Sequence, residues 1–280
     1  MDMIFGLDAQ LASWLKEDIG SGDITTNAIV GPERTTTGII HAKDTGVLAG
    51  VEVAEHVFRL LDADIEFTAK LQDGAALDKT SVIAEVKGSA RAILTGERLA
   101  LNLLQHMSGV ATRTHKLAAI AAPYGAVLVD TRKTTPGLRL LDKYAVKVGG
   151  GKNHRLGLYD AMLIKDNHIQ VAGGIRQALD LAHAYAGHMT KIEIEVEDLA
   201  GVKEALAGGA DVIMLDNMAP EKMAEAVKLI DHRAVVEASG GIDETTLAAA
   251  AQSGVDVISV GALTHSVKAL DISMDIGHIK

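Results

Sequence analysis

The chain has 280 residues, with 37 acidic and 27 basic side chains and a formal charge of -10. This balance argues against a general nucleic-acid-binding protein, because binding to a phosphate backbone requires a surplus of Lys and Arg. The lack of cysteine excludes disulfides, thiolate metal sites and thiol nucleophiles, so any catalysis would depend on His, Lys, Arg, Asp, Glu and Ser.

The N-terminal segment does not resemble a secretion signal. Asp2 and Asp8 precede the first Lys or Arg, and no small-residue cleavage site follows an apolar run. Elsewhere, no charge-free stretch offers the roughly 18 apolar residues that a membrane span requires. We therefore expect a cytoplasmic protein.

Residues 1–105 are predicted to form an N-terminal α+β domain. Apolar side chains recur at helical spacing over residues 7–15, whereas residues 38–42 and 81–86 are short apolar runs typical of strands. Helical spacing returns over residues 95–117, which predicts a long helix that links this domain to the next.

Residues 106–267 are predicted to form an incomplete, open α/β barrel. Short apolar runs alternate with helical stretches, so successive strands must be parallel, in either an open doubly wound sheet or a barrel. We favour a barrel of six or seven strands, because about 165 residues are available and an eight-stranded barrel takes roughly 250. The predicted strands are 127–129, 162–164, 192–196, 212–215, 235–238 and 257–260.

The C-terminal tail has the pattern of one more strand. Apolar and polar side chains alternate from Leu270 to Ile276, which is typical of a strand with one buried face. We expect the tail, residues 268–280, to join the sheet of the N-terminal domain.

Polar or glycine-rich segments follow or end each predicted barrel strand. In parallel α/β folds, ligands bind where the strands end, so these segments are expected to form one composite site. They are Asp130 to Lys133, Lys165 to His168, Glu193 with Glu195, Asp216 with Asn217, Ser239 to Gly241, and Gly261 with Ala262.

The last two strand ends favour phosphate binding. Ser239, Gly240 and Gly241 precede a helix expected to begin near Asp243 or Thr245, and such a loop exposes backbone N–H groups that bind phosphate. The same residues are also found in ordinary loops, so the motif is weak by itself. His265 would add a further donor.

Two carboxylates, Glu195 and Asp216, are expected at neighbouring strand ends. Carboxylate oxygens suit Mg²⁺, which completes its coordination with water and substrate phosphates. A carboxylate pair would also serve glycoside hydrolysis, or would merely neutralise nearby lysines. Glu193 has the same strand parity as Glu195, which leaves open which of the two faces the site.

Positive charge is concentrated in one segment of this acidic chain. Residues 98–165 contain 11 Lys and Arg against 3 acidic residues. Arg132, Lys133, Arg155 and Lys165 lie at predicted strand ends or in the glycine-rich loop between them, where they would bind a polyanion. The expected ligand is small and carries carboxylates and phosphates.

Three sequence runs resemble the signature of the quinolinate phosphoribosyltransferase family: residues 130–139, 149–155 and 163–168. The resemblance extends over nearly the whole chain. It includes residues 17–18, 22–26, 96–98, 108–109 and 269–273.

This resemblance implies an N-terminal α/β sandwich, rejoined by the tail, and an open barrel of seven strands, of which the sequence pattern locates six. It implies that quinolinate and phosphoribosyl pyrophosphate, with Mg²⁺, give nicotinate mononucleotide, pyrophosphate and carbon dioxide in de novo NAD biosynthesis. It also implies a homodimer, or a larger assembly of dimers, in which the neighbour's N-terminal domain covers each barrel mouth.

The resemblance also implies roles for individual residues. Lys133, Lys165, Glu195 and Asp216 would be catalytic, and the two carboxylates would hold Mg²⁺ or the ribose hydroxyls. The implied substrate-binding residues are Thr131, Arg132, His154 and Arg155 with Arg98 of the partner subunit for quinolinate, Lys133 and Lys165 for pyrophosphate or a carboxylate, and Ser239, Gly240, Gly241, Val260, Gly261, Ala262 and His265 for the ribose 5-phosphate.

Three alternatives stay open at this stage. A molybdenum-transport-associated paralogue has a similar Thr-Arg-Lys segment, but the run from Lys165 to His168 favours the quinolinate enzyme. A barrel aldolase would use Lys165 to form a Schiff base. A sensor of phosphate-bearing ligands would bind in the same site without turnover.

Overall fold

The computed structural model describes residues 6–279, which fall into two compact units. The first unit comprises the described residues through Arg113, together with Leu140–Gly149 and the chain from Val267 onward. The second unit comprises Thr114–Arg139 and Gly150–Ser266. The sequence pattern places Leu140–Gly149 in the barrel domain, whereas the structure groups this segment with the first unit. The grouping depends on contacts between residues far apart in the sequence, which local patterns do not reveal.

The first unit is a mixed α/β layer built on an antiparallel sheet. Within the described residues, this sheet has four strands in the order β12-β1-β5-β3, and a separate pair is formed by β2 and β4. The elements are α1 (Leu7–Ile19), α2 (Ile24–Ile29), β1 (Thr35–Ala42), β2 (Gly46–Val47), α3 (Val51–Leu61), β3 (Glu66–Ala69), β4 (Ala76–Leu77), β5 (Val82–Ser89), α5 (Arg139–Val148) and β12 (Ile272–Ile276). The long helix α4 (Ala90–Ala121) begins in the first unit and ends in the second.

The tail strand β12 lies at the edge of this sheet. It pairs antiparallel with β1, from Gly38 opposite Ile276 to Ala42 opposite Ile272. Ile272 and Met274 are buried, as the alternation of the tail predicts. On the same pair of strands, the buried His41 side chain lies with Nε2 3.0 Å from Asp275 Oδ2.

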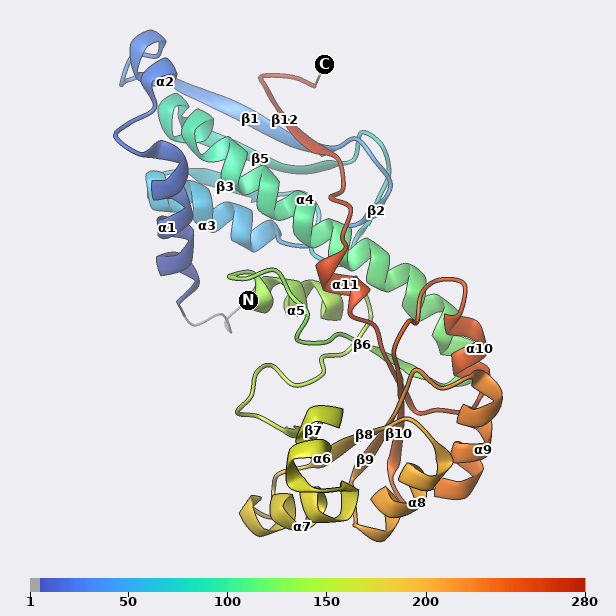
Figure 1. The fold of residues 1–280 in the computed structure, drawn as a ribbon. Helices are drawn as coiled ribbons and strands as arrows, with labels where there is room; N and C mark the ends of the chain where they lie inside the picture. Colours follow the sequence, from blue (N-terminus) through green and yellow to red (C-terminus); the bar gives the residue numbers. More distant parts are fainter. Residues whose placement is uncertain (1–5, 280) are drawn as a thin grey trace. The chain divides into compact units, whose positions relative to one another are not determined.

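The second unit contains a parallel sheet. In the described residues, this sheet has six strands in the order β6-β11-β10-β9-β8-β7. The first strand of the unit, β6, pairs with the last, β11, and the other strands follow in sequence order, so the sheet curls into a barrel. In a doubly wound sheet, the order of the strands would instead change direction in the middle of the sheet. Helices lie outside the strands (Figure 1). The elements are β6 (Val127–Val129), β7 (Met162–Ile164), α6 (Asp166–Ala172), α7 (Ile175–Tyr185), β8 (Ile192–Val196), α8 (Leu199–Ala207), β9 (Val212–Asp216), α9 (Pro220–Ile230), β10 (Val235–Ser239), α10 (Leu247–Gln252), β11 (Val257–Ser259) and α11 (Ala262–His265), with the 3₁₀ turn Ala122–Tyr124.

Lys152 takes the place of a seventh strand. It forms an isolated parallel bridge with Val129 on the outer side of β6, and its backbone N–H donates to the Leu128 carbonyl at 2.9 Å. The barrel is open between this bridge and β7 in the described part of the chain. A single bridging residue produces no run of apolar residues in the sequence, so the sequence pattern locates only six strands.

Between residues 6 and 279, we find no helix with both the length and the apolar character needed to cross a membrane.

Candidate active site

The C-terminal ends of the barrel strands surround a cavity of about 490 Å³ in the second unit. This volume is within the range of about 300 to 1,000 Å³ for small-molecule sites. The lining residues are Thr131, Arg132, Lys133, His154, Arg155, Leu163, Lys165, Glu195, Met214, Asp216, Asn217, Ser239, Gly240, Gly241 and Ser259. The polar strand ends thus form one composite site.

Position along β8 decides which of its two carboxylates faces the cavity, because Glu193 and Glu195 have the same strand parity. Alternate residues of a barrel strand point inward, and those nearest the C-terminal end line the mouth. Glu195 lines the cavity, whereas Glu193 is 6% exposed and lies one layer deeper. The neighbouring strand repeats the pattern, with Asp216 at the mouth and Met214 below it.

The cationic side chains of the cavity are Arg132, Lys133, Arg155 and Lys165. Burial lowers the pKa of the Arg155 guanidinium, and the positive charge of Arg132 lowers it further. Among the described residues, the Nε atoms of Arg132 and Arg155 are buried and have no hydrogen-bond partner. Guanidinium groups stay charged at neutral pH and match carboxylate geometry, so this part of the cavity suits an anion.

The carboxylates Glu195 and Asp216 lie among these cations. Glu195 Oε1 accepts from Lys165 Nζ at 3.0 Å; burial raises the pKa of Glu195, and Lys165 opposes that shift. Asp216 Oδ2 accepts from the side-chain amide of Asn217 at 2.8 Å. The side chain of Lys165 is thus held at the mouth of the cavity by a carboxylate of the neighbouring strand.

The loop Ser239–Gly241 follows β10 into the cavity. Gly240 has φ +86°, and a Cβ there would lie 2.8 Å from the Asn217 backbone nitrogen and nearer still to its side-chain amide. Only glycine fits this close approach. The backbone of the loop is thereby held against the end of β9.

Asp243 caps the start of the helix that follows this loop. Its Oδ1 accepts from the backbone N–H groups of Thr245 and Thr246, and α10 begins at Leu247. The Leu247 N–H donates to the Asp243 carbonyl at 2.9 Å, so the first helical hydrogen bond starts at Asp243, in agreement with the expected start near Asp243 or Thr245. An anion in the cavity would meet the backbone of Ser239–Gly241, because a carboxylate already occupies the helix N-terminus.

Ser259 at the end of β11 lines the cavity, whereas the residues that follow this strand contact the site indirectly. Gly261 leaves room for Lys133, because a Cβ at Gly261 would lie 2.9 Å from Lys133 Cδ. His265 Nδ1 lies 2.7 Å from Ser266 Oγ. Among the described residues, those that line the cavity do not include Val260, Gly261, Ala262 or His265.

Arg98 lies on α4 in the first unit. Its side chain is 60% exposed, with Nη2 3.9 Å from Glu97 Oε1. It lines a separate hollow with Trp14, Glu17 and Asp18 of the same unit. The expectation that Arg98 of the partner subunit completes the cavity stays a prediction.

Two family models together match nearly the whole chain. The N-terminal domain of quinolinate phosphoribosyl transferase matches residues 23–108, and the C-terminal domain matches residues 110–275. The chain belongs to this family. The resemblance seen in the sequence runs and the expected α/β fold class are both confirmed.

Relatives in the quinolinate phosphoribosyltransferase family are similar over most of their length. A probable nicotinate-nucleotide pyrophosphorylase (carboxylating) of Bacillus subtilis is 48% identical over 260 residues, which cover 93% of this chain and 90% of the relative. The crystal structure of NadC from Streptococcus pyogenes is 44% identical, with a TM-score of 0.94, and the match covers 99% of this chain and 98% of that one. For the nicotinate-nucleotide pyrophosphorylase of Francisella tularensis, the identity is 41%, the TM-score 0.92 and the coverage 96% and 95%.

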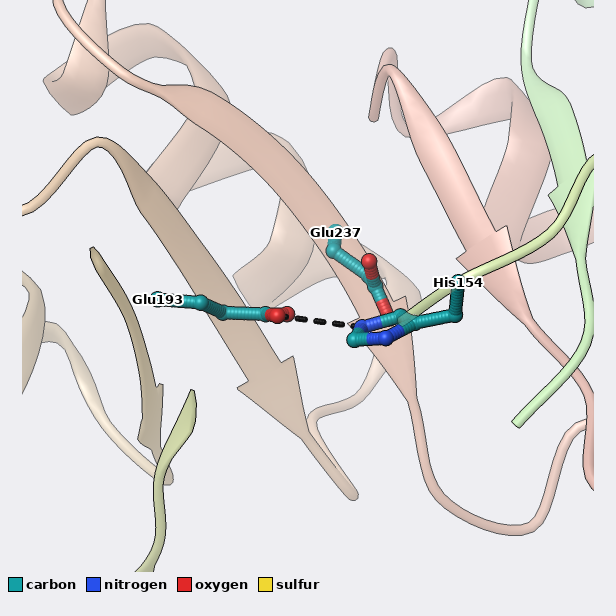
Figure 2. A group of neighbouring side chains, drawn as sticks. All are labelled: His154, Glu193 and Glu237. Atoms are coloured by element: carbon teal, nitrogen blue, oxygen red, sulfur yellow. Dashed lines mark ion pairs between the residues drawn. The ribbon is translucent and has the colours of Figure 1, made fainter. Parts of the chain in front are cut away.

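In this member of the quinolinate phosphoribosyltransferase family, a buried cluster below the cavity was not expected from the sequence. His154 Nε2 lies 3.0 Å from Glu193 Oε2 and 3.6 Å from Glu237 Oε1 (Figure 2). Glu237 has the same parity on β10 as Ser239, so it points into the barrel. The sequence does contain one signal for this cluster: Glu237 is a charged residue inside an otherwise apolar strand. Buried charged residues are rare unless they are paired, so such a residue suggests a buried partner.

Proposed function

We propose that this chain transfers the phosphoribosyl group of phosphoribosyl pyrophosphate to quinolinate, with decarboxylation, and yields nicotinate mononucleotide, pyrophosphate and carbon dioxide for NAD biosynthesis. The observation that carries the proposal is the cavity, where two partly buried arginines and two lysines lie with carboxylates of neighbouring strands in a chain of this family. Quinolinate is a dianion and the second substrate is a polyphosphate, so both match the charge of this lining.

The transfer step needs binding and charge stabilisation more than a general base. The pyridine nitrogen attacks the ribose carbon with its own lone pair, and the bond from that carbon to the pyrophosphate oxygen breaks. Arg132 and Arg155 are proposed to hold the two carboxylates, while Lys133 and Lys165 stabilise the negative charge of the leaving pyrophosphate.

Decarboxylation follows ribosylation. The carbon–carbon bond to the carboxylate beside the ring nitrogen breaks, carbon dioxide leaves, and the electron pair stays on the ring carbon until that carbon takes a proton. The positive charge of the pyridinium stabilises this pair, so the first step prepares the second. The protein contributes a site that keeps the ring oriented.

Glu195 and Asp216 fit a magnesium ion. Both lie at the ends of adjacent strands, both offer carboxylate oxygens, and both line the same cavity. Mg²⁺ is commonly held by one or two carboxylates plus substrate phosphates, and it would neutralise charge on pyrophosphate. The same two side chains are proposed to orient the ribose hydroxyls.

A product assay tests this function. Purified protein with quinolinate, phosphoribosyl pyrophosphate and Mg²⁺ is expected to form nicotinate mononucleotide and carbon dioxide in equal amounts, measured by chromatography and by release from carboxyl-labelled quinolinate. Nicotinate in place of quinolinate is expected to give little product, since it lacks the second carboxylate. Binding of phosphoribosyl pyrophosphate without pyrophosphate release would instead identify a sensor.

We also propose a homodimer, or an assembly of dimers, in which Arg98 of the partner subunit completes each cavity. The support is the family membership, together with the exposure of Arg98 and its lack of any strong ion pair among the described residues.

A further inference from the structure

The cluster of His154, Glu193 and Glu237 is unusual for the inside of a barrel. Barrel interiors are filled mainly by branched apolar side chains, and a buried ionised carboxylate is costly unless it is paired. Glu193 is 6% exposed and Glu237 is 3% exposed, yet both point at the imidazole of His154, which itself lines the cavity (Figure 2). This arrangement indicates a functional role, because apolar residues would fill the same space at less cost.

The hydrogen bonds of His154 define its protonation. The backbone N–H of Arg155 donates to His154 Nδ1 at 2.8 Å, and an amide N–H cannot accept, so Nδ1 carries no proton. The ring proton is therefore on Nε2, which lies 3.0 Å from Glu193 Oε2. Both ring nitrogens have partners within the protein, and neither is left to donate to a substrate carboxylate.

The same geometry argues against a metal ion in the cluster. The three side chains bring their ligand atoms within 4.8 Å of one another, and such a donor set can bind a divalent metal. A histidine ligand must offer a lone pair, however, and the nitrogen that faces both carboxylates is the protonated one.

The imidazole connects the carboxylates to Arg155. The backbone N–H of His154 donates to Asp130 Oδ1 at 2.9 Å, so the residue is held through its backbone as well as its ring. Arg155 follows directly, and its Nη1 donates to the Ala161 carbonyl at 3.2 Å while its side chain lines the cavity. Displacement of the ring would remove the acceptor for the Arg155 N–H and shift this guanidinium.

We propose that Glu193, assisted by Glu237, is a positioning residue of the acid-binding site: it fixes the His154 ring, which in turn orients Arg155 toward a substrate carboxylate. His154 then acts through Arg155 and is not itself a ligand of the substrate, in contrast to the role that the family resemblance implies. The inference rests on the proposed function for the identity of the acid, but the state of the imidazole does not depend on it.

The first test is solid-state NMR on protein labelled with ¹⁵N-histidine, with the His154 signals assigned by their loss in His154→Gln. We expect a neutral ring protonated at Nε2, both in the protein alone and with saturating quinolinate. A proton on Nδ1 in either state would overturn the proposal. This measurement needs no turnover, so it separates failure of the inference from failure of the proposed function.

The second test compares Glu193→Gln with Glu193→Met. The glutamine amide oxygen still accepts the Nε2–H bond, whereas the methionine side chain is of similar length and accepts it poorly. We expect the KM for quinolinate to rise by roughly tenfold or more in Glu193→Met and by less than about threefold in Glu193→Gln, with little change in the KM for phosphoribosyl pyrophosphate. The exposed Glu225 on α9 provides matched controls, Glu225→Met and Glu225→Gln, which should match the unmodified enzyme.

A double-mutant cycle gives the decisive outcome. If His154 acts only through the geometry that Glu193 fixes, His154→Gln should add less than about twofold to the defect of Glu193→Met. An additive loss of quinolinate affinity in the two backgrounds would show that His154 binds the substrate directly. Equal defects in Glu193→Gln and Glu193→Met would likewise contradict a role through the hydrogen bond.

Discussion

Without a bound ligand, the guanidinium groups of Arg132 and Arg155 destabilise the folded state. Burial and the charge of Arg132 lower the pKa of Arg155, and each Nε is buried without a hydrogen-bond partner among the described residues. A buried donor without an acceptor costs about 1 to 3 kcal/mol. A ligand with two carboxylates would remove both penalties, which explains why these residue types lie together in a cavity proposed to bind a dianion.

Glu237→Gln is predicted to change how stability depends on pH. Burial, followed by the negative charge of Glu193, raises the pKa of Glu237 from 4.5 to about 7. The folded state therefore binds this proton more tightly than the unfolded state, and the resulting stability is present below pH 4.5 and lost as the pH rises through about 7. Between pH 5 and 8, the free energy of unfolding of the unmodified protein should fall relative to Glu237→Gln, by an amount on the order of 3 kcal/mol.

Urea unfolding at several pH values, followed by circular dichroism, measures this difference. Carboxylates distant from Glu237 titrate alike in both proteins, so their contributions cancel when the two curves are subtracted. Glu225→Gln, an exposed change of the same kind, should keep the unmodified pH dependence. Parallel curves for Glu237→Gln and the unmodified protein would show that Glu237 titrates in its ordinary range.

The predictability of single residues depends on where they lie along a strand. Arg132, Lys165, Glu195 and Asp216 could be predicted to share one site because they follow or end strands, and the structure brings them to one cavity. The place of Glu237 in the site could not be predicted in this way, because it depends on the contact between the inward face of β10 and the loop that carries His154. The tautomer of His154 likewise depends on a hydrogen bond that only folded coordinates reveal.

At the scale of elements, the loop Ser239–Gly241 shows how one strand end is shaped by its neighbour. The apolar runs predict the strands well, since each is a short buried segment between helices. The start of α10 is also marked in the sequence, because Asp243 is a residue type that caps helices and its side chain accepts from the first amides. The lone bridge at Lys152 and the membership of α5 in the first unit depend on long-range contacts, which local patterns do not encode.

Gly240→Ala is predicted to weaken binding of the phosphate-bearing substrate. The new Cβ would meet Asn217, and φ +86° is unfavourable for alanine, so the loop backbone must move. We expect the KM for phosphoribosyl pyrophosphate to rise roughly tenfold or more, while quinolinate affinity, measured by calorimetry, changes less than about threefold. The control is Gly187→Ala, where a Cβ would meet nothing within 4 Å. An unchanged KM for phosphoribosyl pyrophosphate would argue that the phosphate binds elsewhere.

At the scale of the whole molecule, the charge of -10 is an average that conceals a division along the chain. Residues 98–165 carry 11 Lys and Arg against 3 acidic residues, and this segment supplies the cations of the cavity. Arg98 begins the same segment but lies on α4 of the first unit. We propose that this charge serves the cavity of another copy of the chain.

The shared site is testable by mixing two inactive variants, Arg98→Ala and Lys165→Ala. In a mixed dimer, one cavity combines an intact Lys165 with Arg98 of the partner subunit, and the other cavity lacks both. Random exchange at equal amounts makes half of the dimers mixed, so about a quarter of the unmodified activity should return.

Exchange itself is measured by affinity capture of one tagged variant and detection of the other. The matched control mixes Lys165→Ala with Glu195→Ala: both residues line the cavity of their own chain, so every mixed cavity keeps one defect and activity should stay absent. If exchange occurs and the Arg98→Ala mixture also stays inactive, Arg98 acts within its own subunit or outside the site. Recovery in the first mixture alone would mean that the catalytic unit is the dimer, because no single chain would then hold all the charges that the reaction requires.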